Sequence, residues 1–420
     1  MKVSILGAAK EVGRSAFLVN SNQTSILMDY GVLLKREPIF PMHVKPKDID
    51  AVVITHAHLD HSGFVPSLFL SDSVETQVCG TLPTFDLSQL LIEDMIKISG
   101  FYLPFEYIDL ITMMKHSKNL PYRQPFMIND VKVTLHESGH ILGGATIIVE
   151  HEGKRLFYTG DINTRGSKIL RPADLDFGEV DLVIMESTYS QTEQMPREQS
   201  ERELLEYAYE VVERGGTLFV PAFSVERAQE IACVLKAYNF PHKIAMDGMA
   251  LKANEIMLRH PAFLRNPEIF KKAIGEAEWI SGWNRRKRVV REPCVIISPA
   301  GMLVGGSAVF YIQEIAQNDK NGIALVSFQG EGTPGRALLE KRVTILDGKV
   351  RKCLADVKRF EFSGHNSRSE LFEILDRIKG NPKILTVHGD ELSCTKFAEE
   401  IRRKYGYDAK APNTGEVIEI

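Results

Sequence analysis

Six consecutive residues, His56-Ala57-His58-Leu59-Asp60-His61, bring three imidazoles and one carboxylate together in a short stretch of the chain. They follow the apolar residues 51–54, a run that is typical of a buried strand. Side chains at alternate positions of an extended segment point the same way, so His56 and His58 can bind one metal ion. Asp60 and His61 begin the next turn and can face a second ion. Imidazole and carboxylate ligands without thiolate suit zinc or a similar borderline ion. A polar loop with chance histidines is the competing interpretation, which the ligand density disfavours.

More candidate ligands and acids lie at the ends of other predicted strands. A single Asp after a strand is usually a cap or turn residue, and a lone His is usually a surface or satisfied core group. Active groups of layered α/β folds, however, collect where strands end and loops begin. Five such strand ends supplying a His or an acid favour one shared site, built from Asp29, His140, Asp161, Glu186 and His388.

The length and composition indicate an ordinary globular protein. The 420 residues are 44% hydrophobic and 25% charged, enough for about two or three domains. There is no run of about eighteen apolar residues and no signal-peptide pattern, so no membrane association is expected. The five cysteines are widely spaced without a C-x-x-C pair, which indicates buried thiols and a cytoplasmic location. With a net charge of −4, the chain must hold any nucleic acid by local charge.

The pattern of elements changes twice along the chain. Short strands followed by polar loops extend to about residue 190, and 191–197 is a polar linker. Strands and helices then alternate, which predicts a mostly parallel sheet, followed by a hairpin turning at Asp347-Gly348. The first pattern returns near 358. Because the candidate ligand His388 lies beyond the alternating block, the block must be an insertion. The predicted domains are 1–190, 191–357 and 358–420, with the first and last forming one domain.

Together these segments resemble the metallo-β-lactamase superfamily, specifically its β-CASP ribonuclease family. That family includes the nuclease subunit of the cleavage and polyadenylation specificity factor and its archaeal homologues, here in the form without N-terminal KH domains. The implied fold is α/β: an αββα sandwich with an inserted β-CASP domain on a mostly parallel sheet. The resemblance rests on residues 27–31, 56–61, 139–143, 158–161, 185–189, 220–223, 227–230, 298–302, 362–365 and 387–389.

The resemblance implies two Zn²⁺ ions per chain. One would be bound by His56, His58 and His140, and the other by Asp60, His61 and His388. Asp161 would bridge both ions, and Asp29 would fix a ligand imidazole from behind. In this family a histidine at the position of His388 is associated with RNA substrates and a valine with DNA, so RNA is the expected substrate.

The chemistry of phosphodiester hydrolysis agrees with that assignment. Two nearby metal ions can ionise a shared water and hold the reacting phosphate. The leaving oxygen still needs a proton. His365 is the candidate acid, and Glu186 can orient it and keep it protonated. The expected catalytic residues are thus His365, Glu186 and Asp60, although His365 could instead be a structural neighbour of the helix that follows.

Three further segments are candidates for RNA contact. Ser367 begins a capping box, which explains it structurally, but the same helix start could bind a phosphate. Gly305 and Gly306 lie in a glycine-rich turn before a helix, where substrate contact and tight packing are equally good interpretations. The third segment is basic, with two tryptophans just upstream, as in proteins that grip single strands; a solvated edge is the simpler alternative. Its candidate residues are Arg285, Arg286 and Arg288.

The sequence therefore predicts a zinc-dependent ribonuclease that acts on single-stranded RNA in RNA processing or decay. Internal cleavage and trimming from the 5′ end both remain open. The alternatives are an ester or thioester hydrolase, a DNA-processing nuclease, and a non-catalytic RNA-binding subunit. The resemblance also implies a homodimer and partners in an RNA-processing complex.

Overall fold

The computed structural model describes residues 1–35, 37–71, 75–346 and 348–420. The chain forms two compact units. Unit 1 comprises Met1–Gly166, Arg171–Glu193 and Gly364–Ile420, and unit 2 comprises Ser167–Leu170 and Gln194–Ser363. Unit 1 is therefore assembled from three stretches of the chain. The predicted division at 190 and 357 stays a prediction, although the two units separate close to those positions.

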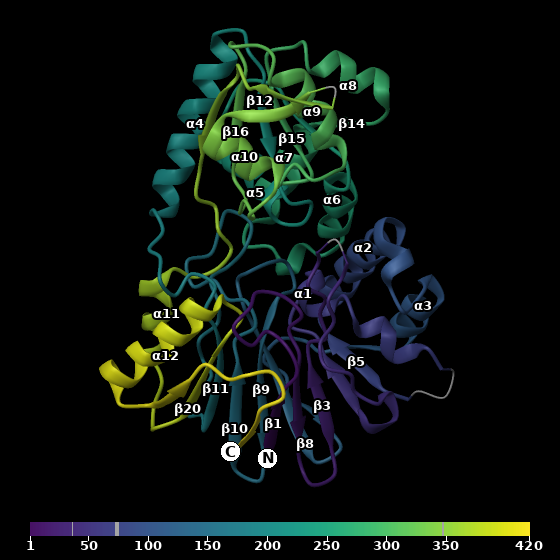
Figure 1. The fold of residues 1–420 in the computed structure, drawn as a ribbon, viewed down its shortest axis with the longest axis vertical. Coiled ribbons are helices and arrows are strands. Elements are labelled where there is room, and N and C mark those ends of the chain that lie inside the picture. The colour runs from purple at the N-terminus through teal and green to yellow at the C-terminus, as the bar shows by residue number, and fades with distance from the viewer. Residues whose placement is uncertain (36, 72–74, 347) are drawn as a thin grey trace. The chain divides into compact units, whose positions relative to one another are not determined.

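Unit 1 contains two seven-stranded sheets, which Figure 1 shows side by side. The first sheet runs in the order β22 (Val417–Glu419), β1 (Lys2–Ile5), β2 (Phe17–Asn20), β3 (Ser25–Met28), β4 (Ala51–Val53), β5 (Gln77–Gly80) and β6 (Ser117–Asn119). The second runs in the order β21 (Asp408–Lys410), β20 (Lys383–Val387), β11 (Leu182–Glu186), β10 (Lys154–Tyr158), β9 (Ala145–His151), β8 (Val131–Glu137) and β7 (Phe126–Ile128).

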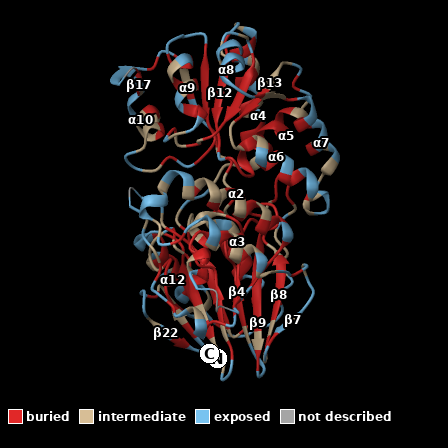
Figure 2. Cartoon of the chain, turned by 90° about the vertical axis from the view of Figure 1, so that its right-hand side faces the viewer, coloured by how far each residue is buried: buried red, intermediate tan, exposed pale blue. Residues whose placement is uncertain are grey.

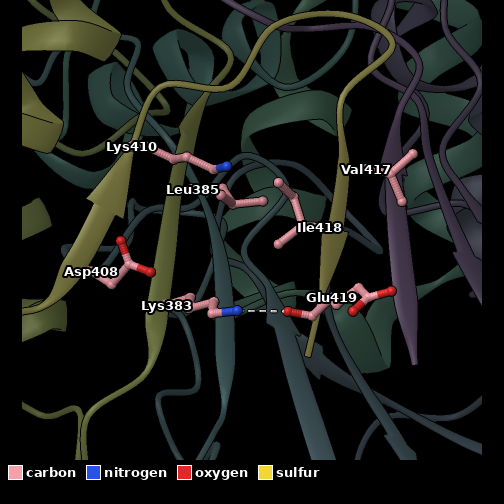
Figure 3. Close-up of a pocket in the computed structure, with 7 residues that line it drawn as sticks. All are labelled: Lys383, Leu385, Asp408, Lys410, Val417, Ile418 and Glu419. Carbon is pink, nitrogen blue, oxygen red and sulfur yellow. Dashed lines mark hydrogen bonds between the residues drawn. The ribbon is translucent and has the colours of Figure 1, made fainter.

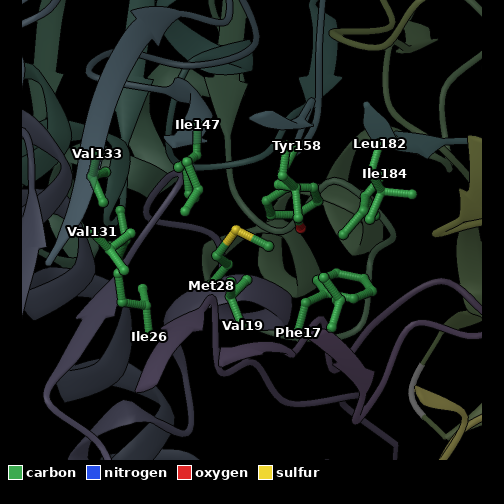
Figure 4. Close-up of a cluster of buried hydrophobic side chains, with 14 of the residues drawn as sticks. Phe17, Val19, Ile26, Met28, Val131, Val133, Ile147, Tyr158, Leu182 and Ile184 are labelled. Carbon is green, nitrogen blue, oxygen red and sulfur yellow. The ribbon is translucent and has the colours of Figure 1, made fainter. Parts of the chain in front are cut away.

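The inward faces of the two sheets form one apolar core. Phe17, Ile26 and Met28 of the first sheet belong to the same buried cluster as Val133 and Tyr158 of the second, and Figure 4 shows these side chains facing one another. Burying one such side chain stabilises the fold by roughly 1.5–3 kcal/mol. This core requires the alternation of inward and outward residues that the strands carry in sequence.

Helices cover the outer face of each sheet. The first sheet packs on α2 (Leu82–Ser99) and α3 (Tyr107–Lys115) through a second core cluster. The other sheet packs on α11 (Arg368–Leu375) and α12 (Glu391–Tyr405) through a third. Thr81 caps α2 by accepting from the Thr84 N–H, and Asp390 caps α12 in the same way. Unit 1 is therefore the αββα sandwich that the sequence predicted.

The edges of the two sheets also meet at a pocket of about 170 Å³, lined by residues of β20, β21 and β22. Figure 3 shows its lining, in which the Lys383 ammonium donates to the main-chain oxygen of Glu419 at 2.8 Å. This contact ties the end of the first sheet to the second.

Unit 2 is built on a six-stranded sheet whose paired strands are all parallel. The order is β14 (Glu278–Ile280), β13 (Ile244–Asp247), β15 (Val295–Ser298), β12 (Leu218–Pro221), β16 (Gly322–Leu325) and β19 (Asp356–Arg359). Its central strands are fully buried, as Figure 2 shows in red. The helices of the unit are α4 (Arg197–Glu213), α5 (Arg227–Ala237), α6 (Ala250–Arg259), α7 (Pro267–Glu276), α8 (Trp283–Val289), α9 (Ser307–Ile315) and α10 (Pro334–Lys341). The mostly parallel sheet predicted for the insertion is confirmed.

Two details of unit 2 concern its turns. Helix α5 begins only at Arg227, because Glu226 adopts φ 70° and ψ −59° and the Arg227 N–H donates to the Val225 oxygen, which makes a tight γ-turn. The predicted hairpin is present as β17 (Val343–Leu346) and β18 (Lys349–Lys352). Its turn residue Asp347 lies outside the described residues.

None of the helices in the described part of the chain has the length and apolar character that a bilayer span needs.

Candidate metal centre

The first four candidate ligands lie where the chain leaves β4. His56 and His58 precede the short helix α1 (Leu59–Ser62), and Asp60 and His61 lie within it. The extended exit and following turn are therefore both present, and they point the four side chains in two directions. The main chain around Asp60 can follow this path only because the neighbouring residue 31 is glycine. A Cβ on Gly31 would lie 1.8 Å from the Asp60 main-chain oxygen.

One group of ligand atoms consists of His56, His58, His140 and one oxygen of Asp161. His58 Nδ1 lies 3.1 Å from the Nε2 atoms of His56 and His140. Asp161 Oδ2 lies 3.5 Å from the first of these Nε2 atoms and 3.4 Å from the second. Two ligands of a tetrahedral zinc, each about 2.05 Å from the ion, stand about 3.3 Å apart. The spacing of this group therefore fits one tetrahedral ion.

A second group consists of Asp60, His61, His388 and the other oxygen of Asp161. Asp161 Oδ1 lies 3.3 Å from His61 Nε2 and 3.3 Å from His388 Nδ1. Asp60 Oδ2 lies 3.3 Å from His388 Nε2. In each group the ligand atoms lie within 4.8 Å of one another. Asp161 thus presents one oxygen to each group, the position that a bridging ligand occupies.

One buried ligand atom of the centre lacks an ordinary hydrogen bond in a way that suits a metal. Asp161 is 2% exposed, and its Oδ1 accepts no hydrogen bond of good geometry among the described residues. An unsatisfied buried carboxylate oxygen is costly. A cation between it and the neighbouring imidazoles would remove that cost. The residues present therefore fit metal ions, and the cluster indicates metal binding.

Burial and charge set the protonation of the cluster. Burial lowers the pKa of His56 and His140 well below the usual value, which leaves both rings neutral and able to act as ligands. Burial alone would lower the pKa of His61, but Asp161 and Asp29 raise it well above the usual value. Burial would likewise raise the pKa of Asp161, but the electrostatic influence of the neighbouring His388 and His61 rings lowers it well below the usual value. The centre therefore favours an ionised bridging carboxylate.

Polar contacts on the side away from the metal centre fix the orientation of the His61 ring. Asp29, which is fully buried, accepts from the ring at 2.7 Å (Nδ1 to Oδ2), and this leaves Nε2 for the centre. Asp29 also accepts from the Thr55 main-chain N–H at 2.7 Å and from the Tyr158 hydroxyl at 2.9 Å. Sequence reasoning identified Asp29 but missed Thr55 and Tyr158. Each of these two residues lies next to a ligand motif in the sequence. That proximity is the only feature of the sequence that could have identified them.

His140 is held by a comparable contact, because its Nδ1 lies 2.8 Å from the Gly364 main-chain oxygen. A Cβ on Gly364 would lie 3.1 Å from this same ring nitrogen, so only glycine leaves the ring undisturbed. Gly364 immediately precedes His365. The same turn therefore positions a candidate ligand and the candidate acid.

His365 lies beside the centre and contacts both acids near it. Its Nδ1 is 2.9 Å from Glu186 Oε2, and its Nε2 is 3.8 Å from Asp161 Oδ2. The ring is partly exposed, whereas Glu186 is buried and also accepts from the Ile162 N–H. Burial lowers the pKa of His365, but the charges of Glu186 and Asp161 outweigh it and raise the pKa to about 9. The Glu186–His365 pair can therefore hold a proton on Nε2 of His365, the ring nitrogen that faces the metal centre.

The three segments predicted to contact RNA have structural partners of their own. Ser367 caps α11 in a capping box with Glu370. Gly306, at φ 63°, is the N-cap of α9, and the Cβ position of Gly305 is open. These observations establish their local roles, and their contact with RNA stays a prediction.

In the basic segment, the structure separates one arginine from the other two. Arg286 pairs with the buried Asp247 through two contacts of 2.6 and 2.9 Å. Arg288 is 62% exposed and pairs with Glu278 at 3.1 Å, and Arg285 donates to the Trp279 oxygen. Arg286 therefore has a structural partner that sequence could not show. Its neighbours are better placed to meet a ligand.

Three family models match successive parts of this chain. A metallo-beta-lactamase superfamily domain matches residues 18–189, a Beta-Casp domain matches 228–338, and a Zn-dependent metallo-hydrolase RNA specificity domain matches 352–412. The chain belongs to the metallo-β-lactamase superfamily, in its β-CASP family. The family predicted from the sequence is confirmed.

Particular relatives cover the whole chain. The chain is 37% identical to RNase aCSPSF2 of Saccharolobus solfataricus, matching 100% of this chain and 85% of that protein. It is 36% identical to transcription termination factor FttA of Methanocaldococcus jannaschii, over 100% of this chain and 72% of that one. It is 32% identical, over the full length of both, to a protein of the same organism named "Probable RNase MJ4". A crystal structure of a protein of unknown function from Enterococcus faecalis covers 100% of this chain at 15% identity with a TM-score of 0.64, a likeness of fold alone.

Proposed function

We propose that this protein is a zinc-dependent ribonuclease that hydrolyses RNA phosphodiester bonds with two zinc ions per chain. The observation that carries the proposal is Asp161, which presents one carboxylate oxygen to each of two histidine-rich groups. Beside it stands the His365–Glu186 pair, which is not needed for either group. A two-ion centre with an adjacent acid is what phosphodiester hydrolysis requires.

The residues that would hold the ions are the two groups described above, with Asp161 shared between them. When bound, two zinc ions ionise a shared water near neutral pH and stabilise negative charge on the phosphate. Glu186 accepts from His365 Nδ1 and so keeps the acidic proton on Nε2. His365 then donates this proton to the departing sugar oxygen. Asp29 holds His61 so that its Nε2 faces the centre.

RNA is supported as the substrate by the relatives and by one residue. Two of the relatives carry the name RNase and another is named a transcription termination factor. The residue at the end of β20 is His388, the type that the resemblance associates with RNA. The alternatives are a DNA-processing nuclease, an ester or thioester hydrolase and a non-catalytic subunit. A different result of the experiment described next would exclude each of them.

The test uses purified protein loaded with zinc and RNAs labelled at either end, bearing a 5′-triphosphate, monophosphate or hydroxyl. Cleavage of RNA, with DNA of the same sequence and a chromogenic ester left intact, is the expected result. The pattern of labelled products then separates internal cleavage from 5′-end trimming. No RNA cleavage with two bound zinc ions per chain would refute the proposal. Light scattering on the same sample tests the predicted homodimer.

A further inference from the structure

Trp283, the first residue of α8, presents an exposed indole ring on unit 2. The residue is 59% exposed, and single exposed apolar side chains are common on protein surfaces. This ring differs from most because two neighbours hold it. The guanidinium carbon of Arg286 lies 5.3 Å from the ring centroid, and the Phe310 ring of α9 lies 5.4 Å away at an interplanar angle of 84°. The indole is therefore held in one orientation while much of it stays in contact with water.

The two neighbours of Trp283 depend on one buried carboxylate, that of Asp247 at the end of β13. Asp247 accepts two hydrogen bonds from Arg286, at 2.6 and 2.9 Å, and one from the Tyr311 hydroxyl at 2.7 Å. Hydrogen bonds between charged groups are stronger than neutral ones. Because Tyr311 follows Phe310 in α9, the carboxylate fixes both the guanidinium beside the indole and the helix that carries Phe310. The support of Trp283 is thus built into the fold before any ligand binds.

The surface around Trp283 carries more cations than acids. Residues 278–292, together with Lys243 and Asp247 that pair with them, hold six basic and three acidic side chains, a formal charge of +3. The three acids are all paired, and their partners are Lys243, Arg286 and Arg288. The exposed cations that pair with no acid among the described residues are Arg285, Lys287 and Arg291. On a chain of net charge −4, this surface attracts an anionic ligand.

Lys287 lies one helical turn after Trp283 in α8. Residues four apart in a helix share a face, with their Cβ atoms about 5–6 Å apart, so the exposed ammonium lies beside the exposed indole. A ring with a cation next to it matches a nucleotide, whose base stacks on the ring while its phosphate meets the cation. An acidic peptide would also attract the cations, but its carboxylate side chains offer no flat face to the indole.

We propose that Trp283 stacks on a base of single-stranded RNA while Lys287 binds an adjacent phosphate. The inference rests on the proposed ribonuclease function and assigns a contact region for its substrate apart from the metal ligands. Arg286 and Asp247 are positioning residues, because they hold the indole and so reduce the entropy lost when RNA binds. Arg285 and Arg291 add to the attraction of the phosphate backbone. Stacking accepts any base, so this contact tolerates many sequences.

The fluorescence of Trp283 tests stacking directly, because the chain has only two tryptophans. The other, Trp279, is half-buried and donates to the Ile274 oxygen at 2.9 Å. In the full-length, zinc-loaded protein with Trp279→Phe and His365→Ala, Trp283 is the one remaining indole and RNA should stay uncut. We expect an oligouridylate to quench its fluorescence. A strand of the same length with abasic sites, which keeps the phosphates but lacks bases, should quench it much less.

Affinity measurements on the same RNA separate the ring from the cation. Trp283→Ala should weaken binding by about 5- to 150-fold, the loss expected for one stacked base, with the slope of affinity against salt unchanged. Trp283→Phe should retain most of the affinity, whereas Trp283→Leu, apolar but not aromatic, should not. Lys287→Gln should flatten the salt slope by about 0.7, the contribution of one phosphate of a single strand.

The control variant is Tyr107→Ala, which removes an exposed ring of unit 1 and should leave the affinity unchanged. Melting temperatures of all variants verify that they fold. Unquenched fluorescence with RNA, or wild-type affinity in Trp283→Ala, would overturn the proposal. Quenching by polyglutamate as strong as that by RNA would also overturn it and assign the surface to an acidic protein. Inactivity of the zinc-loaded wild-type protein on RNA would instead overturn the proposed function, and the binding assays distinguish the two failures because they need no cleavage.

Discussion

The Asp29→Asn substitution tests whether His61 is held as a ligand from behind. Asp29 Oδ2 faces His61 Nδ1 at 2.7 Å and the Tyr158 hydroxyl at 2.9 Å, and Oδ1 faces the Thr55 N–H at 2.7 Å. An asparagine has one acceptor oxygen, so its NH₂ group must face at least one of these donors. If the oxygen stays on Thr55, His61 loses its acceptor and the ring is free to turn.

The expected loss is in metal affinity. Removing the outer partner of a ligand imidazole typically lowers affinity by about 10- to 100-fold, which equals about 1.4–2.7 kcal/mol. The loss should fall on the ion of the Asp60–His61–His388 group. The other ion should be weakened less, because the Gly364 oxygen beside His140 is untouched and Asp29 reaches His56 only through the Thr55 hydroxyl.

The assay is a competitive zinc titration against a chromophoric chelator, with thermal unfolding of the metal-free protein measured alongside. Asp130→Asn is a matched control, since Asp130 accepts from His151 at 2.8 Å in the same unit but outside the ligand groups. It should change unfolding without changing zinc affinity. Two zinc ions bound to Asp29→Asn as tightly as to the wild-type protein would refute the role given to Asp29. Equal weakening of both ions would refute its restriction to one group.

Three other outcomes follow from the same structure. His388→Ala should abolish RNA cleavage and lower bound zinc, whereas His365→Ala should abolish cleavage with zinc retained; equal zinc loss, measured by elemental analysis, would contradict their separate roles. Replacing Arg285 and Arg288 together by Gln should weaken RNA binding and flatten its salt dependence, and an unchanged slope in anisotropy titrations would make the segment a solvated edge. Gly31→Ala should disrupt the metal-ligand loop, because its Cβ would lie 1.8 Å from a main-chain oxygen there; wild-type zinc content and melting temperature would show the packing to be looser.

Helices and strands with a regular spacing of apolar residues could be predicted from the sequence, because that spacing identifies the type of element. The strand ends predicted at Asp29 and His388 are the ends of β3 and β20. The parallel sheet of unit 2 was indicated by strand–helix alternation alone. Strand β16 ends at Leu325 although the next residue, Val326, is also apolar, because the chain turns there and the Gln329 amide donates to the Gly301 oxygen. Such a contact between distant loops leaves no periodic signal.

The candidate ligands could be identified because the type of side chain limits what it can do. His136, four residues before His140, lies within strand β8 and pairs with Asp174, outside the ligand groups. The partners of these side chains were harder to predict. That Arg286 is held by Asp247 depends on β13 and α8 being neighbours, which is a property of the tertiary fold.

The order in which the ligands occur along the chain has a consequence for protein synthesis. Every member of the His56–His58–His140–Asp161 group has been synthesised once the first 161 residues are made. The other group stays incomplete until His388, at the end of β20, joins β11 after the whole of unit 2 has been translated. The first group can therefore be completed early in synthesis, whereas the second can form only when translation is nearly finished.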